Sequence, residues 1–195
     1  PARAYGVYAD SIGNFTNSRS ISAIVNATDF SAEAIAAGVY AYHFIGNFTN
    51  SGSILASANA TSGDAYAYGV YAYNGTIDNF TNSGSISASA TGDYARAYGV
   101  YAGSSIGNFT NSGSISVTAA NANAIGYPAR AYGVYADSIG NFTNSDTGSI
   151  SASANAIGDD AEAYGVYAGV SIGNFTNSNT GSISASASAT GGDAW

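Results

Sequence analysis

The stretch at residues 79–90 reads NFTNSGSISASA, and its second half alternates apolar and polar residues with a period of two. Successive side chains of a β-strand point to opposite faces, so we expect Ile86, Ala88 and Ala90 to face inward and the intervening serines to face outward. A helix is disfavoured, because Ser, Thr, Gly and Asn are poor residues for helix interiors and the i, i+3, i+4 spacing is missing. The stretch therefore predicts a half-buried strand.

This stretch is one copy of a repeat that covers the whole chain. The phenylalanine of each copy lies at Phe15, Phe48, Phe80, Phe109, Phe142 or Phe175, so the steps are 33, 32, 29, 33 and 33 residues. A second phrase, AYGVYA or AAGVYA, keeps the same period. Each unit divides into three short segments, typified by AYGVYA, SIGNFTN and SISASA, with polar and glycine-rich corners between them.

Three short strands per unit, repeated end to end, predict an all-β fold: a parallel β-solenoid (β-helix) of about six coils of 29–33 residues. We expect a single repeat array over residues 1–195, with units at approximately 1–30, 31–63, 64–93, 94–127, 128–160 and 161–193. Because the chain begins and ends within a repeat phrase, we also expect a segment of a longer array or a subunit that stacks on copies of itself.

Stacking of coils places identical residues in columns. The isoleucine column (Ile12, Ile45, Ile77, Ile106, Ile139 and Ile172) and the phenylalanine column are expected to fill the interior. The last asparagine of each phrase (Asn17, Asn50, Asn82, Asn111, Asn144 and Asn177) predicts an amide ladder. A tyrosine column (Tyr8, Tyr40, Tyr71, Tyr101, Tyr135 and Tyr167) is left without a direction, because YGVYA is apolar at nearly every position.

Two details of the corners and of the surface follow from residue types. The corner NSG is expected to use positive φ angles, which Asn and Gly tolerate. Arg3 with Glu33, and Arg130 with Glu162, are expected to pair between coils. Exposed pairs of this kind contribute about 0–1 kcal/mol, so they support register more than stability.

The charge balance limits the partners. The chain has four cations, all arginine, against 12 acidic residues, for a net charge of −8. Nucleic acid is not an expected partner, because binding to phosphates requires clustered cations. The absence of Cys and Met excludes disulfides and thiolate metal sites. No stretch approaches the roughly 20 apolar residues of a membrane span, so this segment is not expected to insert into a bilayer. We expect a secreted or cell-surface location.

No residue is predicted to be catalytic, to bind a cofactor or to hold a metal, and we expect a protein that is not an enzyme. His43 is the only histidine, and Asp159 and Asp160, near Glu162, are the only adjacent carboxylates. General acid–base catalysis needs two positioned groups with separated pKa values, and a solvated corner does not provide them.

Calcium is the one metal that the sequence raises as an alternative. Asp64, Asp93, Asp159 and Asp193 each follow a glycine in the corner before the first strand. One carboxylate per coil leaves most of the six to eight oxygen ligands of Ca²⁺ unfilled, and aspartate at a glycine corner is explained by turn formation.

The phrase Asn-Phe-Thr satisfies the acceptor rule for N-glycosylation six times. The candidate acceptors are Asn14, Asn47, Asn79, Asn108, Asn141 and Asn174. The other interpretation is that these asparagines hydrogen-bond within a strand or corner, and the sequence leaves this choice open.

The phrases NFTNSGSISASA and IGNFTNSGSIS resemble the repeats of large bacterial surface proteins of the autotransporter-passenger and haemagglutinin type. The resemblance covers all six units and implies a right-handed parallel β-helix at the cell surface that serves as a stalk, adhesin or matrix fibre. It implies no site residue.

The main hypothesis is an extracellular structural or adhesive solenoid that associates end to end into fibres, with a surface or glycan receptor as a further candidate partner. Two alternatives are an ice-binding solenoid, which would use the threonine column, and a polysaccharide-processing β-helix enzyme, which would need a cleft that departs from the repeat. The threonine column comprises Thr16, Thr49, Thr81, Thr110, Thr143 and Thr176.

Overall fold

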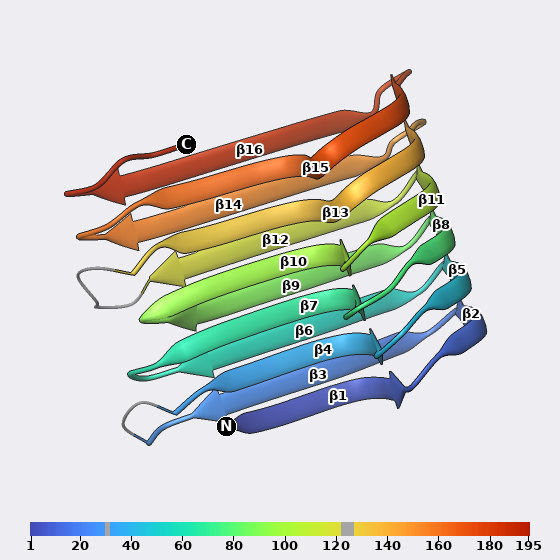
Figure 1. Ribbon diagram of the computed structural model, residues 1–195. Helices are drawn as coiled ribbons and strands as arrows, with labels where there is room; N and C mark the ends of the chain where they lie inside the picture. The colour runs from blue at the N-terminus through green and yellow to red at the C-terminus, as the bar shows by residue number, and fades with distance from the viewer. Residues whose placement is uncertain (30–31, 122–126) are drawn as a thin grey trace.

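The computed structural model describes residues 1–29, 32–121 and 127–195, and over these residues the chain is a stack of parallel β-strands (Figure 1). The described residues contain no helix, and hence none that is long and apolar enough to cross a membrane. The predicted fold is confirmed: an all-β parallel solenoid of about six coils with about three strands per coil. The predicted boundary between the first two units, at residues 30 and 31, lies outside the described residues.

The strands fall into three sets. The first strands of the coils are β1 (Ala2–Ala9), β4 (Ala34–Ala41), β7 (Asp64–Ala72) and β10 (Tyr94–Ala102). The second strands are β2 (Ile12–Asn17), β5 (Ile45–Asn50), β8 (Ile77–Asn82) and β11 (Ser105–Asn111). In the last two coils the first and second strands are continuous, as β13 (Ala129–Asn144) and β15 (Ala161–Asn177). The third strands are β3 (Ser20–Ala27), β6 (Ser53–Ala60), β9 (Ser85–Gly92), β12 (Ser114–Asn121), β14 (Ser149–Ile157) and β16 (Ser182–Thr190).

These strands form two sheets. A 10-stranded sheet has the order β1-β4-β7-β10-β13-β11-β8-β5-β2, with β15 paired to β13, and a six-stranded sheet has the order β16-β14-β12-β9-β6-β3. Strand β13 belongs to both arms of the larger sheet because it continues around the corner of the coil (Figure 1). Identical residues pair throughout, as where Phe109 aligns with Phe80 on one side and Phe142 on the other.

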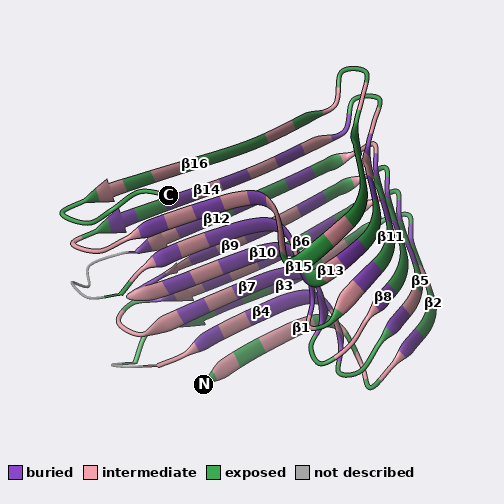
Figure 2. Ribbon diagram, turned by 45° about the horizontal axis from the view of Figure 1, so that its top comes forward, coloured by how far each residue is buried: buried purple, intermediate pink, exposed green. Residues whose placement is uncertain are grey.

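The core lies between the sheets and consists of the predicted columns. Phe48, Phe80, Phe109 and Phe142 are each 1% exposed, and the isoleucines of the same strands are equally buried. The alternation in β9 is confirmed, since Ile86, Ala88 and Ala90 are buried. Burial decreases in the two end coils: neither β1 nor β16 contains a fully buried residue (Figure 2). The core is therefore continuous along the axis and open at both ends.

The glycine of AYGVYA is required by close packing between the two sheets. A Cβ added to Gly99 would overlap Cγ2 of Ile115 and lie 2.6 Å from the carbonyl oxygen of Gly133. The same overlap with the isoleucine of the third strand recurs at Gly38, Gly69 and Gly133. This glycine column lets the isoleucines reach the backbone of the opposite sheet.

The expectation of positive φ angles at the NSG corners is wrong. Among the described residues other than glycine, positive φ occurs only at Asp146 (55°) and Asn179 (58°), in the two longer corners. The glycine of NSG is needed for a different reason: a Cβ on Gly84 would overlap the backbone of Ser51 and Gly52 in the preceding coil. Close stacking of backbones, and not an unusual dihedral angle, therefore fixes glycine at these corners.

Candidate functional surfaces

The outer face of the second strands carries the six candidate glycan acceptors in one exposed column. From the second coil onward, each amide donates a hydrogen bond to the same residue of the preceding coil, as from Asn79 Nδ2 to Asn47 Oδ1 (2.8 Å) and from Asn108 Nδ2 to Asn79 Oδ1 (2.8 Å). The threonine column, which includes exposed Thr81 and Thr110, faces the same way. Strand spacing puts neighbouring acceptors about 4.8 Å apart. Glycosylation of this column stays a prediction.

A second amide ladder lies inside the solenoid, as predicted. Asn50 Nδ2 donates to Asn82 Oδ1 (2.8 Å), Asn82 Nδ2 donates to Asn111 Oδ1 (2.8 Å), and both residues are fully buried. The same amide groups also bond to corner carbonyls, as from Asn82 Nδ2 to Gly84 O (3.3 Å). In this ladder each amide donates to the following coil, whereas in the exposed ladder each amide donates to the preceding coil. The two ladders therefore run in opposite directions.

The outer face of the first strands carries a tyrosine stripe, which we define as two tyrosines per coil. Its members are Tyr5, Tyr8, Tyr40, Tyr68, Tyr71, Tyr98, Tyr101, Tyr132, Tyr135, Tyr164 and Tyr167, with Ala37 in the twelfth position. They form a cluster separate from the main core, which resolves the direction of the tyrosine column: it faces outward. Only one tyrosine column was predicted; the second, of which Tyr98 is a member, is signalled in the sequence by the repeated spacing of two tyrosines three residues apart.

Rings of the tyrosine stripe stack along the solenoid axis. The ring centroids of Tyr98 and Tyr132 are 5.0 Å apart with planes at 5°, and those of Tyr101 and Tyr135 are 4.9 Å apart with planes at 1°. Desolvation by these neighbours raises the pKa of Tyr98 to about 12 and that of Tyr68 well above its usual range. The raised pKa values keep the phenols of Tyr98 and Tyr68 neutral at physiological pH.

The expected ion pairs have different outcomes. Arg130 and Glu162 pair between adjacent coils, with Nη2 2.9 Å from Oε1, as predicted. The pair of Arg3 and Glu33 is wrong, because the register aligns Arg3 with Ile35 and leaves Glu33 two positions away.

The residues considered for catalysis do not form a catalytic group. His43 lies at an exposed corner, with Nε2 3.7 Å from Asp10 Oδ1. Asp159 Oδ1 accepts a hydrogen bond of 2.6 Å from the backbone N–H of Asp160, which closes the corner. Glu162 is held by Arg130. Asp159 therefore stabilises a turn, and Glu162 supports the register between two coils.

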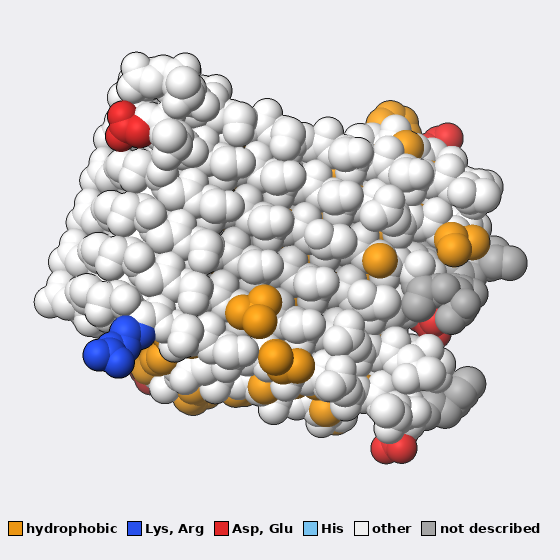
Figure 3. Space-filling model, turned by 180° about the vertical axis from the view of Figure 1, so that it is seen from behind, with side chains coloured by type: hydrophobic (Ala, Val, Ile, Leu, Met, Phe, Trp, Pro, Cys, Tyr) orange, Lys and Arg blue, Asp and Glu red, His pale blue; other side chains and the backbone are white. Residues whose placement is uncertain are grey.

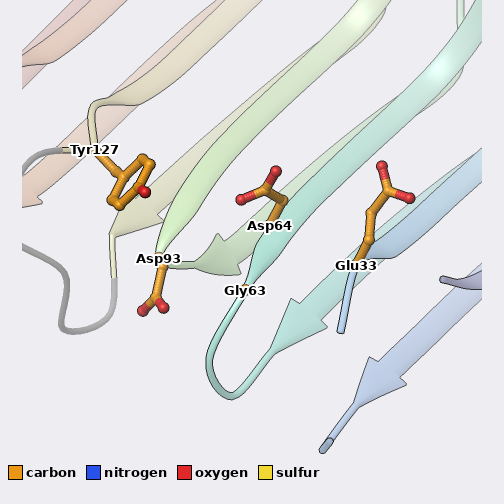
Figure 4. Close-up of a pocket in the computed structure, with 5 residues that line it drawn as sticks. All are labelled: Glu33, Gly63, Asp64, Asp93 and Tyr127. Atoms are coloured by element: carbon orange, nitrogen blue, oxygen red, sulfur yellow. The ribbon is translucent and has the colours of Figure 1, made fainter. Parts of the chain in front are cut away.

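One pocket departs from the repeat, with a volume of about 300 Å³. Glu33, Gly63, Asp64, Asp93 and Tyr127 line it. The carboxylate of Asp93 points away from those of Asp64 and Glu33 (Figure 4). Among the residues that the structure describes, no three His, Asp or Glu side chains are placed to hold a metal ion.

The alignment behind the calcium alternative is wrong. Asp64 pairs with Tyr94, and not with Asp93, in the register of the first strands. The backbone N–H of Asp193 bonds to the side chain of Asp160, and not to that of Asp159 (2.9 Å). The four aspartates therefore belong to two different columns. Asp64 and Asp193 share one column, which Tyr94 and Pro128 interrupt, and Asp93 and Asp159 share the other.

The remaining surface features are a polar back and two open ends. Seen from behind, the molecule shows mostly uncharged polar side chains and backbone, with few and scattered charges (Figure 3). At the C-terminal end, Phe175 is 50% exposed. Beyond β16, Ala194 pairs with Ala161, and the N–H of Trp195 donates to the carbonyl oxygen of Ala161 (2.9 Å). Residues 193–195 thus lie where the first strand of a seventh coil would begin to pair with β15.

Comparison with protein-family models, curated proteins and solved structures finds no match to this chain.

Proposed function

We propose that the chain is a structural or adhesive segment of an extracellular β-solenoid, in a fibre, stalk or matrix, and that its role is mechanical. The observation that carries this proposal is the register: residues of one coil pair with their own copies in the next, in both sheets. Each coil is therefore a template for another coil of the same repeat. In such arrays the free energy of folding is approximately the sum of the stability of each coil and the stability of each interface between neighbouring coils. An array can therefore become longer by adding coils of the same structure.

Side-chain columns add axial contacts to the backbone ladders. The buried amide bonds are 2.8 Å long, and phenylalanine rings stack at 4.9 Å between Phe48, Phe80 and Phe109. Aromatic pairs of this kind contribute about 0.5–1.5 kcal/mol each beyond their burial. These columns favour a stiff rod in which every interface between coils is reinforced in the same way.

The two ends are complementary for head-to-tail stacking of copies. In the exposed ladder, Asn174 donates to Asn141, which leaves the side-chain carbonyl oxygen of Asn174 at the C-terminal end. Asn14 accepts from Asn47, which leaves the side-chain N–H groups of Asn14 at the N-terminal end. Head-to-head stacking would oppose like groups at each edge. The partner that fits each end is therefore the opposite end of a second copy.

The C-terminal residues obstruct this stacking. A second copy in the same register would place its Ala2 on Ala161, where Ala194 already lies. We therefore expect removal of residues 193–195 to increase end-to-end association, measured by analytical ultracentrifugation. Short monodisperse particles at high concentration, for the full chain and for the shortened chain alike, would contradict the stacking proposal.

Disulfide trapping tests the polarity, because the chain has no native cysteine. In a head-to-tail stack, position 16 of one copy neighbours position 176 of the next, at about 4.8 Å, which is within the Cα range of disulfides. A mixture of Thr16→Cys and Thr176→Cys, both made in the chain without residues 193–195, is expected to give a mixed disulfide-linked dimer under mild oxidation. Thr81→Cys, in the same column but mid-array, is the control and is expected to stay monomeric. Dimers within either single variant, in place of the mixed dimer, would refute head-to-tail packing.

One observation favours a second candidate, an ice-binding surface. The exposed asparagine and threonine columns share one face, so the regular polar array is wider than the threonine column alone. Thermal hysteresis of the purified chain tests this function, and its absence would leave the structural proposal unaffected.

A further inference from the structure

The tyrosine stripe is a continuous line of aromatic contacts from the first coil to the sixth. Consecutive ring centroids lie 5.0 Å apart for Tyr8 and Tyr40, and 5.3 Å apart for Tyr40 and Tyr71. The line continues at 5.0 Å from Tyr71 to Tyr101, 4.9 Å from Tyr101 to Tyr135 and 5.1 Å from Tyr135 to Tyr167. Every adjacent pair of coils thus has at least one contact between phenol rings.

The composition leaves these phenols as the most abundant oxidisable groups. The chain has no Cys and no Met, which are the usual targets of oxidants, and a single Trp against 16 Tyr. Oxidants reach the stripe at its exposed members and neighbours: Tyr8 is 62% exposed, and Tyr73, 44% exposed, contacts Tyr71 at 5.6 Å. The tyrosines that an oxidant in solution can reach therefore touch further tyrosines of the stripe.

We propose that the tyrosine stripe is a site of oxidative cross-linking, at which a haem peroxidase using hydrogen peroxide joins tyrosines of neighbouring coils. Each of two tyrosines gives one electron to the oxidant and its phenolic proton to water. The two radicals form one carbon–carbon bond between ring positions ortho to oxygen, and the two ring hydrogens move through solvent to the oxygens, which restores both phenols. Hydrogen peroxide takes up the two electrons and two protons and becomes two water molecules.

Cross-links of this kind would make the axial contacts between coils covalent. The inference concerns links within one chain and does not depend on end-to-end stacking. The second coil is its most sensitive point, because Ala37 replaces one tyrosine there and leaves Tyr40 as the only member of the stripe in that coil. Tyr40 contacts both Tyr5 (5.2 Å) and Tyr8 (5.0 Å) of the first coil. A link between the first two coils must therefore use Tyr40.

The four arginines make the pattern of links readable by trypsin. Cleavage after Arg3, Arg19, Arg96 and Arg130 yields the tripeptide 1–3 and the fragments 4–19, 20–96, 97–130 and 131–195, the last four of which contain the tyrosines. The neighbours Tyr8 and Tyr40 lie in fragments 4–19 and 20–96, and Tyr101 and Tyr135 lie in fragments 97–130 and 131–195. Fragments from adjacent coils can thus be recognised when joined, with a mass two hydrogens below the sum of the parts.

The experiment treats the dilute full chain with peroxidase and hydrogen peroxide, isolates monomer, and analyses its tryptic fragments by mass spectrometry. We expect dityrosine fluorescence, 4–19 joined to 20–96, and 97–130 joined to 131–195. Tyr40→Phe, which keeps the ring but not the phenol, is expected to reduce the first product at least tenfold. Tyr42→Phe is the matched control, because the ring of Tyr42 contacts that of Tyr73 in the third coil, and it should leave that product unchanged.

Two outcomes would overturn the proposal. The first is a folded chain that forms no dityrosine under conditions in which free tyrosine couples. The second is the same distribution of joined fragments in the folded chain and in the chain unfolded in urea, since only the fold brings coils into contact. Neither outcome bears on the disulfide-trapping result, so a failure of this inference is distinguishable from a failure of the stacking proposal.

Discussion

Two asparagines three positions apart in the phrase NFTN have different roles at the scale of single residues. Asn79 is exposed, whereas Asn82 is fully buried, although each makes an amide ladder bond of 2.8 Å. Water can replace the partner of Asn79 but not that of Asn82. A buried polar group that loses its partner costs about 1–3 kcal/mol.

We therefore expect Asn82→Ala to lower the free energy of unfolding by about 1–3 kcal/mol, because it removes the buried amide bonds that Asn82 makes to Asn50 Nδ2 and to Asn111 Oδ1. Asn79→Ala is the matched control, with an expected change below about 0.5 kcal/mol. Urea titration followed by circular dichroism measures both. Equal losses for the two variants would show that burial does not distinguish the two ladders.

The sequence predicted the ladder of Asn82 but not the direction of Asn79. Counting in steps of two from the inward Phe80 places Asn82 inside and Asn79 outside, so the signal was present. The aromatic strand was harder, because Tyr98 and Tyr101 both face outward although they are three positions apart. The ladder skips the intervening Gly99, and a period of two cannot anticipate that irregularity.

At the scale of strands and corners, the packing of the first strand on the third depends on glycine. We expect Gly99→Ala to destabilise the fold by about 1–3 kcal/mol, because the new methyl group would overlap Ile115 and crowd the carbonyl oxygen of Gly133. Gly13→Ala is the control: a Cβ there meets nothing within 4 Å, so stability should change by less than about 0.5 kcal/mol. Comparable urea midpoints for the two variants would argue against the close approach of the sheets.

The limits of local sequence show most clearly in two identical segments. Residues 8–17 and 135–144 both read YADSIGNFTN. The first copy forms two strands with a break between β1 and β2, whereas the second lies within the single strand β13. The difference comes from the neighbouring coils, since Ser138 pairs with Ser105 and Ser171 while the corner after Ala9 faces Tyr42 and His43. Pairing across coils, which no local pattern contains, therefore decides where a strand ends.

For the whole molecule, the tyrosine stripe predicts the pH dependence of stability. The pKa of Tyr98 is raised to about 12 by burial, against about 10 in an unfolded chain. Below about pH 10 both states keep the phenolic proton, and the stability that this proton maintains is fully present. Above about pH 10 the unfolded chain loses the proton first, so the free energy of unfolding falls by up to about 1.4 kcal/mol per pH unit for such a phenol.

Urea midpoints at about pH 9 and about pH 11 measure this effect, and we expect a lower midpoint at the higher pH. Tyr98→Phe should reduce the difference between the two midpoints, because it removes one titrating group and keeps the ring stack. A midpoint that is constant across this range would contradict the desolvation of the stripe.

The whole architecture was predictable because one repeat of about 30 residues covers the chain and alternates with the period of a strand. The candidate surfaces were less so. The pocket lined by Glu33, Asp64 and Asp93 arises where the register departs from the repeat, and the alignment of aspartates by their preceding glycine was misleading there. The alignment of such irregular positions depends on the pairing register between neighbouring coils at each corner, and the local sequence does not contain this register.

The opposite directions of the two amide ladders have an electrostatic consequence for long arrays. A row of parallel amide dipoles would accumulate partial charge at its ends, as the peptide dipoles of an α-helix do. Here the row that contains Asn82 points toward the C-terminal coil, and the row that contains Asn79 points toward the N-terminal coil. The axial components of the two rows cancel coil by coil. A solenoid built on this repeat can therefore lengthen without building up a side-chain dipole along its axis.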